Sequence, residues 1–130
     1  MENLRFFADI TKSNVPESGG KGASLGELTN ACIPVPPGFV VLAHAFDRFI
    51  EKTKLKEEII ARLAEVNPDD MASVERASRV LRDVIHDTPM PLDLTSEILT
   101  AFDQLGAEFV AVRSSATAED SSVASWAGEL

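Results

Sequence analysis

Apolar positions in the first part of the chain alternate between short continuous runs and helical spacing. Leu4–Ala8 is a short apolar run that predicts an opening strand, and Phe39–Leu42 has the pattern of a buried strand. Between them, Asp9–Gly20 is rich in Asn, Pro, Ser and Gly, which predicts a loop with room for a phosphate-sized turn. Residues 23–31 carry apolar side chains at helical spacing, and the prolines of 33–38 end that predicted helix.

The middle of the chain is dominated by amphipathic helical stripes. Residues 45–50 and 55–66 place apolar side chains at helical spacing, and the second stripe has Lys and Glu on the opposite face. Asn67-Pro68 supplies a capping residue and a first-turn proline for a further helix that runs to Ile85. These segments predict helices that pack through one face.

The last part of the chain returns to a helix followed by a strand pattern. After a Pro-containing linker at 87–91, residues 94–105 form another helical stripe that Gly106 closes. Phe109–Val112 is a short apolar run and predicts a buried strand. This order of elements predicts an α/β fold with a small sheet and several packing helices.

Composition and charge narrow the class of protein. A chain of 130 residues with 45% hydrophobic and 25% charged residues is typical of one soluble globular domain. Its net charge of -9 argues against a nucleic-acid or anionic-membrane surface, both of which need a basic face. The single cysteine, Cys32, excludes an internal disulfide framework and a multi-thiolate metal site, and indicates a reducing compartment.

The two ends of the chain carry different information. The N-terminal segment has an early acid and no apolar run long enough for a signal peptide or membrane span, so we expect a cytoplasmic location. The chain breaks off at Trp126-Ala-Gly-Glu-Leu130 without a capping, charged or trailing segment typical of a natural end. We therefore expect residues 1–130 to be a fragment of a longer protein.

A glycine-rich segment, Gly19–Gly26, runs into the first predicted helix. Free backbone N–H groups and the positive end of the helix dipole would face an anion there, and Lys21 adds a mobile charge. The Walker pattern fails, because Val15 and Gly22 occupy positions that require glycine and Ser or Thr. The segment is either an anion site or a tight turn with an exposed lysine.

Arg113 lies where the last predicted strand ends. Its guanidinium presents a rigid fork of donors suited to phosphate oxygens, and the hydroxyls of Ser114-Ser115 can donate beside it. The alternative is a structural ion pair with Glu119 or Asp120. The residues alone leave both interpretations open.

Other candidate chemistry is weaker. Ser125–Gly128 is either a turn that brings backbone close to a ligand or a plain loop packed by Trp126. His44 and His86 lie on predicted helices beside aspartates, without a triad-like setting, so we expect neither to be catalytic. No carboxylate pair has metal-ligand spacing. We expect no catalytic residue and no metal ligand within residues 1–130.

Three motifs occur in order along the chain. They are Gly-Gly-Lys-Gly-Ala-Ser-Leu-Gly-Glu at 19–27, Ile-Pro-Val-Pro-Pro-Gly-Phe-Val-Val at 33–41 and Val-Arg-Ser-Ser-Ala-Thr-Ala-Glu-Asp at 112–120. Together they closely resemble the N-terminal ATP-binding domain of the family of phosphoenolpyruvate synthases (pyruvate, water dikinases), pyruvate, phosphate dikinases and rifampicin phosphotransferases. The resemblance covers the chain from end to end, and the ordered set is far more specific than any single motif.

The resemblance implies an ATP-grasp-type nucleotide-binding domain, of which residues 1–130 are the N-terminal part and which continues beyond Leu130. By motif matching, Lys21 and Arg113 are the cations that hold the ATP phosphates. The segment that starts at Ser125 matches the family's phosphate loop. Backbone N–H groups of Gly128 and Glu129 are therefore expected to approach the terminal phosphates.

The family's chemistry sets the expected function. ATP phosphorylates a histidine on a separate domain, which passes a phosphoryl group to pyruvate, so the synthase turns ATP, pyruvate and water into AMP, phosphoenolpyruvate and phosphate. The Mg²⁺ ligands, the phosphohistidine and the pyruvate site are expected beyond Leu130, so the fragment alone should have negligible dikinase activity. Alternatives are a rifampicin phosphotransferase-like enzyme, which shares this domain, and a non-catalytic nucleotide-binding or interaction module.

Three positions depart from the family's usual pattern. Cys32 replaces the glycine before the Ile-Pro-Val-Pro-Pro run, so we expect an unfavourable backbone conformation or a slightly different turn at the helix exit. Glu129 replaces the more common glutamine, and a carboxylate near phosphates is repulsive unless it faces a cation. Trp126 replaces phenylalanine as a larger apolar side chain.

Overall fold

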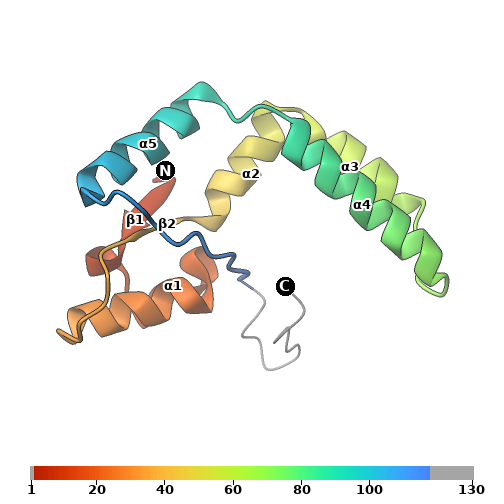
Figure 1. Cartoon of the computed structure of the whole chain (residues 1–130). Helices are drawn as coiled ribbons and strands as arrows, with labels where there is room; N and C mark the ends of the chain where they lie inside the picture. The colour runs from red at the N-terminus through yellow and green to blue at the C-terminus, as the bar shows by residue number, and fades with distance from the viewer. Residues whose placement is uncertain (1, 118–130) are drawn as a thin grey trace. The chain divides into compact units, whose positions relative to one another are not determined.

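The computed structural model describes residues 2–117. The chain forms two compact units, one made of Met1–Phe46 with Asp93–Leu130 and the other of Asp47–Leu92. The described residues form a helix-rich mixed α/β structure with a small two-stranded sheet (Figure 1), as the sequence predicted. Helix α2 (Ala43–Lys52) carries the chain from the first unit into the second.

The sheet belongs to the first unit. Strand β1 (Leu4–Phe6) pairs antiparallel with β2 (Phe39–Val41), with Leu4 opposite Val41 and Phe6 opposite Phe39. The rings of that second pair lie 5.7 Å apart at a tilt of 57°, an aromatic cross-strand contact that stabilises the register. The two strands predicted at Leu4–Ala8 and Phe39–Leu42 are confirmed. The first ends earlier than predicted, because Phe7–Asp9 forms a 3₁₀ helix, η1.

Helix α1 (Val15–Asn30) begins earlier than the sequence predicted. The segment expected to be a loop up to Gly20 contains a 3₁₀ turn, η2 (Lys12–Asn14), and the first turn of α1. Pro16 in that first turn is compatible with a helix start, because its missing N–H would have no intrahelical partner there. At Gly19 the backbone leaves the helical conformation, with φ 70° and ψ 168°, and the helix resumes at Gly20.

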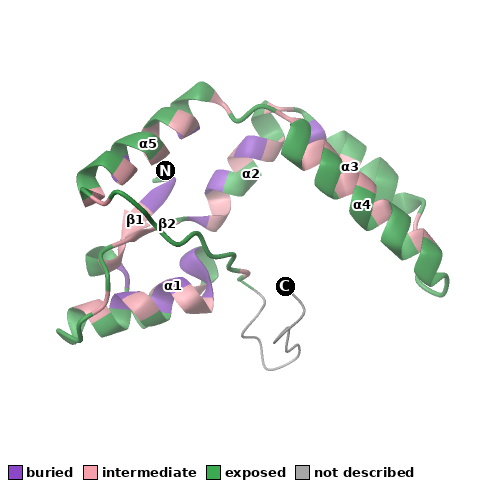
Figure 2. Ribbon diagram, in the orientation of Figure 1, coloured by how far each residue is buried: buried purple, intermediate pink, exposed green. Residues whose placement is uncertain are grey.

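Two glycines let α1 approach the sheet side of the first unit closely. A Cβ at Gly22 would lie 2.9 Å from Val40 Cγ2, and a Cβ at Gly26 would lie 2.7 Å from Ile10 Cβ. Ile10 is fully buried, as is Leu42 after β2, and buried positions line one face of α1 in Figure 2. Small residues on this face therefore place the start of α1 against the core.

The C-terminus of α1 is closed by Cys32 in the left-handed conformation, with φ 58°. Its N–H donates to Thr29 O at 3.1 Å, and the Ile33 N–H donates to Leu28 O at 3.0 Å, which is the hydrogen-bond pattern of a Schellman cap. Glycine normally occupies this position because a Cβ is strained there. The expectation of an unfavourable backbone conformation at the helix exit is confirmed.

Replacing Cys32 with glycine is expected to stabilise the first unit by about 1 kcal/mol, because it removes the left-handed strain of a residue with a Cβ. Urea denaturation followed by circular dichroism measures the change. Cys32→Ala is the matched control, since alanine keeps the Cβ and should bring no such gain. Equal stability of the glycine and alanine variants would show that the backbone at this cap is relaxed.

Helix α5 (Leu92–Leu105) confirms the helical stripe near the end of the chain, and Gly106 closes it with φ 62°. The segment Phe109–Val112 was predicted as a buried strand, and here the prediction is wrong for the described structure. It forms no strand, and Phe109 and Val112 are 85% and 94% exposed. An apolar run indicates a tendency to be buried, but it does not supply the partner strand.

In the second unit, helices α3 (Leu55–Ala64) and α4 (Met71–Asp87) pack against each other as a helical hairpin. Asp70, not Asn67, caps α4, because its carboxylate accepts from the Ala72 N–H at 3.1 Å. Asn67 Oδ1 instead accepts from the Asp69 N–H at 3.1 Å and holds the preceding turn. Among the described residues, no helix is both long and apolar enough to span a membrane.

Candidate functional site

The two sequence motifs that carry Lys21 and Arg113 meet in the first unit. Lys21 Nζ donates to the carbonyl oxygen of Ser114 at 3.2 Å, across 93 residues of sequence. Ser115 Oγ donates to the carbonyl oxygen of Ser18 at 3.4 Å. The extended segment that contains Arg113 therefore lies against the start of α1.

The break in α1 creates a helix start beside these contacts. Because the helix resumes at Gly20 after the non-helical Gly19, the N–H groups of its first turn lack carbonyl partners within the resumed helix. Such N–H groups and the positive end of the helix dipole attract anions. Lys21, half-buried on this turn, adds a full positive charge to the same place.

Arg113 is exposed in the same segment, one residue before the carbonyl that Lys21 contacts. The proposed alternative partners, Glu119 and Asp120, lie outside the described residues, as do Gly128 and Glu129. Of the residues expected to hold ATP, the structure thus describes the two cations and brings their segments together. An arginine and a lysine on adjoining segments can hold an anion with several negatively charged oxygens.

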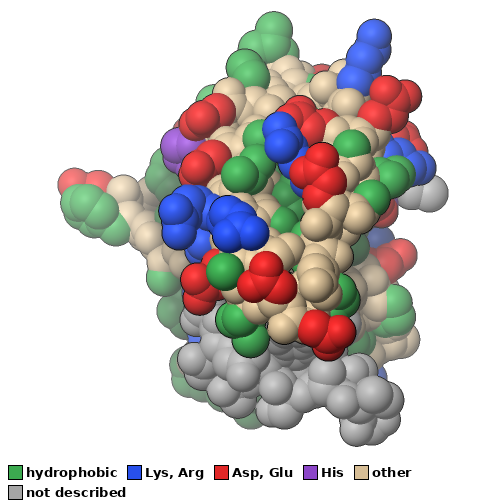
Figure 3. Space-filling view, turned by 90° about the vertical axis from the view of Figure 1, so that its right-hand side faces the viewer, with side chains coloured by type: hydrophobic (Ala, Val, Ile, Leu, Met, Phe, Trp, Pro, Cys, Tyr) green, Lys and Arg blue, Asp and Glu red, His purple; other side chains and the backbone are tan. Residues whose placement is uncertain are grey.

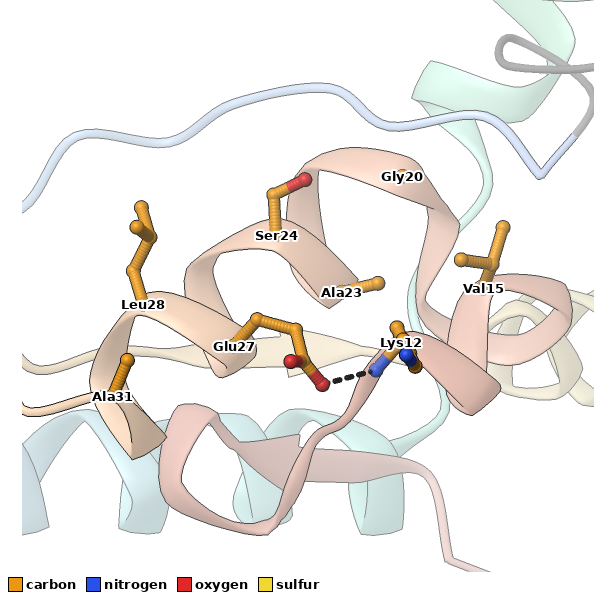
Figure 4. Close-up of a pocket in the computed structure, with 8 residues that line it drawn as sticks. All are labelled: Lys12, Val15, Gly20, Ala23, Ser24, Glu27, Leu28 and Ala31. Atoms are coloured by element: carbon orange, nitrogen blue, oxygen red, sulfur yellow. Dashed lines mark hydrogen bonds between the residues drawn. The ribbon is translucent and has the colours of Figure 1, made fainter.

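A groove of about 560 Å³ runs along the outer face of α1 (Figure 4). Small residues of the helix form much of its lining, and Glu27 crosses it to accept a hydrogen bond from the Lys12 backbone N–H at 2.7 Å. The lining residues are Lys12, Val15, Gly20, Ala23, Ser24, Glu27, Leu28 and Ala31. The groove begins next to the helix start, at Gly20.

Arg5 and the face shown in Figure 3 illustrate how other charges of the described chain are arranged. Arg5 pairs with two carboxylates, those of Glu2 and Glu17, each at 3.0 Å, and the hydrogen bond that Arg5 donates to Glu2 raises the pKa of Arg5. The face shown in Figure 3 mixes acidic, basic and apolar side chains without a continuous basic surface on its described part. Within residues 2–117, no group of three His, Cys, Asp or Glu side chains could hold a metal ion.

The two histidines lie on helices α2 and α4. His86 Nδ1 lies 3.0 Å from Asp87 Oδ1 on the exposed end of α4. His44 Nε2 is buried and has no hydrogen-bond partner within the described part of the chain. The described contacts of neither histidine form a triad, and the expectation that the histidines are not catalytic stays a prediction.

The hydrogen bond that His86 Nδ1 donates to the Asp87 carboxylate raises the pKa of His86 above its ordinary value of 6.5. We expect an NMR titration to show this raised pKa, and Asp87→Asn to lower it toward the ordinary value. Because the folded-state pKa is the higher one, the contact adds stability that is fully present below pH 6.5 and is lost as the pH rises through the raised pKa. An unchanged His86 titration in Asp87→Asn would contradict the contact.

A helix start with a lysine, joined by an arginine-bearing segment in a helix-rich α/β unit, defines a class of domain able to hold an anionic ligand. Comparison with known proteins makes the class specific. Residues 15–130 match the family described as pyruvate phosphate dikinase, AMP/ATP-binding domain. The chain belongs to this family, which confirms the resemblance seen in the three motifs.

Similar proteins point to one branch of the family. The chain is 42% identical to a probable phosphoenolpyruvate synthase of Methanothermobacter thermautotrophicus, over 97% of this chain and 19% of that protein. It is 47% identical to a probable phosphoenolpyruvate synthase of Archaeoglobus fulgidus, over 95% and 17%. A phosphoenolpyruvate synthase of Helicobacter pylori is 37% identical, over 99% and 17%. The chain thus spans about a fifth or less of the length of these relatives.

Proposed function

We propose that this chain is the ATP-binding segment of a phosphoenolpyruvate synthase-like phosphotransferase. Residues 1–130 would be the N-terminal part of an ATP-grasp-type domain that continues beyond Leu130. The observation that carries the proposal is the meeting of the Lys21 and Arg113 segments at the helix start of α1, in a chain of the AMP/ATP-binding family. The curated relatives named above favour a synthase over a rifampicin phosphotransferase.

In this proposal, the ATP phosphates lie at the start of the resumed helix, at Gly20. Lys21 and Arg113 neutralise their charge, and the helix N–H groups donate to their oxygens. Backbone N–H groups of Gly128 and Glu129 complete the grip on the terminal phosphates. Mg²⁺ would neutralise further phosphate charge when bound, and from the family resemblance we expect its ligands beyond Leu130.

The residues suit a binding role more than a chemical one. Phosphoryl transfer depends mainly on positioning and charge neutralisation, which two cations and a helix start can provide. The acceptor histidine and the pyruvate site would belong to other domains of the parent protein. The overall reaction would convert ATP, pyruvate and water into AMP, phosphoenolpyruvate and phosphate, and the protein would work in the cytoplasm.

Truncating either cation tests this function. Lys21→Ala and Arg113→Ala should each weaken MgATP binding at least tenfold, because a charge-assisted hydrogen bond contributes about 1.5–3 kcal/mol and about 1.4 kcal/mol is a factor of ten. Isothermal titration calorimetry of the protein measures the affinity. Lys56→Ala and Arg79→Ala are controls for the loss of a positive charge alone. Each removes an exposed cation of the second unit and should leave MgATP binding unchanged.

The outcome of these four variants separates the hypotheses. Loss of affinity only at Lys21 and Arg113 supports the phosphate-binding role. Unchanged MgATP affinity in both of these variants would show that the two cations do not hold the nucleotide. Equal losses of MgATP affinity in all four variants would show that the effect comes from net charge alone.

A further inference from the structure

We propose that Gly19 is a positioning residue, which sets the spacing between Lys21 and Arg113 by letting Ser115 pack directly onto its backbone. We call this contact the Gly19 joint and define it by Gly19, Ser115 and the carbonyl group of Ser18. The inference rests on the proposed function, because the spacing matters only if the two cations share one ligand.

The geometry of the joint requires glycine for two independent reasons. Gly19 has φ 70°, a conformation that strains any residue with a Cβ. In addition, a Cβ at this position would overlap Ser115 Oγ and would lie 3.3 Å from Ser115 Cβ. Gly19 is itself buried, whereas Ser115 is exposed, so the overlap is relieved only if the Ser115 hydroxyl turns away and loses its hydrogen bond to Ser18 O.

The joint lies close in sequence to both proposed phosphate ligands. Lys21 follows Gly19 by two residues, and Arg113 precedes Ser115 by two residues. A fully extended chain advances about 3.3–3.6 Å per residue, so each cation's backbone stays within roughly 7 Å of the joint. The hydrogen bond from Lys21 Nζ to Ser114 O then closes a small ring of contacts around the joint.

Ser115 contributes a directional contact as well as its bulk. Its hydroxyl donates to Ser18 O, the last carbonyl before the break in α1. The break therefore serves two purposes, since it frees N–H groups at Gly20 and presents the Ser18 carbonyl to the second segment. In this arrangement a change at Gly19 alters the position of Arg113 without touching either cation.

The structure offers a matched control for the backbone effect. Gly106 also has a positive φ, 62°, but a Cβ there would meet nothing within 4 Å. Gly106→Ala thus introduces the strain of a positive φ without the overlap, whereas Gly19, with ψ 168°, lies in a region that is essentially restricted to glycine. The double variant Gly19→Ala/Ser115→Gly keeps the strain at Gly19 and removes both the hydroxyl and the Cβ that the new methyl group would strike.

Trypsin cleavage after Arg113, followed by mass spectrometry without nucleotide, reports whether the segment is docked. Cleavage of a locally opened segment follows its opening equilibrium, so Gly19→Ala should raise the rate at the Arg113–Ser114 bond by about tenfold or more. Gly106→Ala should leave that rate unchanged. Ser115→Gly alone, which loses the hydrogen bond to Ser18 O but creates no overlap, is the reference for the double variant. Gly19→Ala should raise the rate much less in the Ser115→Gly background than in the wild type, even if Gly19→Ala alone proves too unstable to fold.

MgATP affinity is measured on the same proteins. Gly19→Ala should weaken binding by about tenfold, the equivalent of about 1.4 kcal/mol, and this loss should be smaller in the Ser115→Gly background. If Gly19→Ala changes cleavage and binding as much in the Ser115→Gly background as in the wild type, the contact with Ser115 does not position the segment and the proposal is wrong. Equal effects of Gly19→Ala and Gly106→Ala would also overturn it, since strain alone would then explain the loss.

The two readouts keep this proposal separate from the proposed function. Docking is measured without nucleotide, whereas the role of the cations is measured by Lys21→Ala and Arg113→Ala. If those two variants bind MgATP normally while Gly19→Ala still exposes the Arg113–Ser114 bond, the nucleotide assignment fails and the joint remains as a structural contact. If the cations matter but Gly19→Ala neither exposes the bond nor weakens binding, only the joint is refuted.

Discussion

Gly26→Ala is expected to destabilise the first unit by about 3 kcal/mol or more, the upper range for overpacking a close contact. The new Cβ would lie 2.7 Å from Ile10 Cβ and 2.8 Å from Ile10 C, and it would come closer still to the carbonyl oxygen. That oxygen already accepts a hydrogen bond from Asn30 Nδ2 at 2.9 Å, which ties it to the far end of α1. Relief therefore requires a shift of backbone, because no flexible side chain can give way.

Urea denaturation monitored by circular dichroism measures this loss. Ser24→Ala, on the exposed face of the same helix, is the control and should change stability by less than about 0.5 kcal/mol. A stable Gly26→Ala protein would show that α1 can move away from Ile10, and the close packing of helix on core would have to be reconsidered.

Leu42→Ala should cost about 2–5 kcal/mol, the range for removing a buried leucine side chain from a core. Leu42 is 1% exposed and follows β2 directly. Its N–H donates to Asn3 O at 2.8 Å and its carbonyl accepts from the Ala45 N–H at 2.9 Å. Because alanine keeps both backbone hydrogen bonds, the loss reports the cavity left by the side chain.

The neighbouring residue provides the comparison for this second variant. Val41 is half-exposed at 45%, so Val41→Ala removes fewer buried atoms and should cost less than about 1.5 kcal/mol. Both values come from the same denaturation experiment. Equal losses at the two positions would show that side-chain burial around β2 does not follow the structure.

The sequence predicted helices well where the apolar stripe was long and the cap unambiguous. Residues 94–105 and Gly106 are the best example, since the stripe and the closing glycine both match α5. Starts were harder, because Asn, Pro and Asp are common in loops as well as at helix caps. For this reason the start of α1 was predicted too late, and the cap of α4 was assigned to Asn67 in place of Asp70.

The spacing of apolar residues could not predict which distant segments of the chain contact each other. Phe109–Val112 has the residues of a strand, yet the described chain gives it no strand partner. The family motifs identified Lys21 and Arg113 as candidate phosphate ligands. The residues alone left two roles open for Arg113, a structural ion pair and a phosphate contact. The contact of Ser115 with Ser18 joins residues that are 97 positions apart. The sequence near Ser18 signals this contact only through Gly19, whose conformation requires a residue without a Cβ.

The left-handed cap at Cys32 has a practical consequence for spectroscopy. Cys32 is exposed and is the single cysteine of the chain, so a thiol-reactive fluorophore or spin label would attach there in this chain without other substitutions. The resumed helix from Gly20 to Asn30 has a rise of about 1.5 Å per residue, which sets the label roughly 16 Å from the helix start. Energy transfer or paramagnetic relaxation over that length can measure whether a labelled nucleotide binds beside Lys21, as proposed.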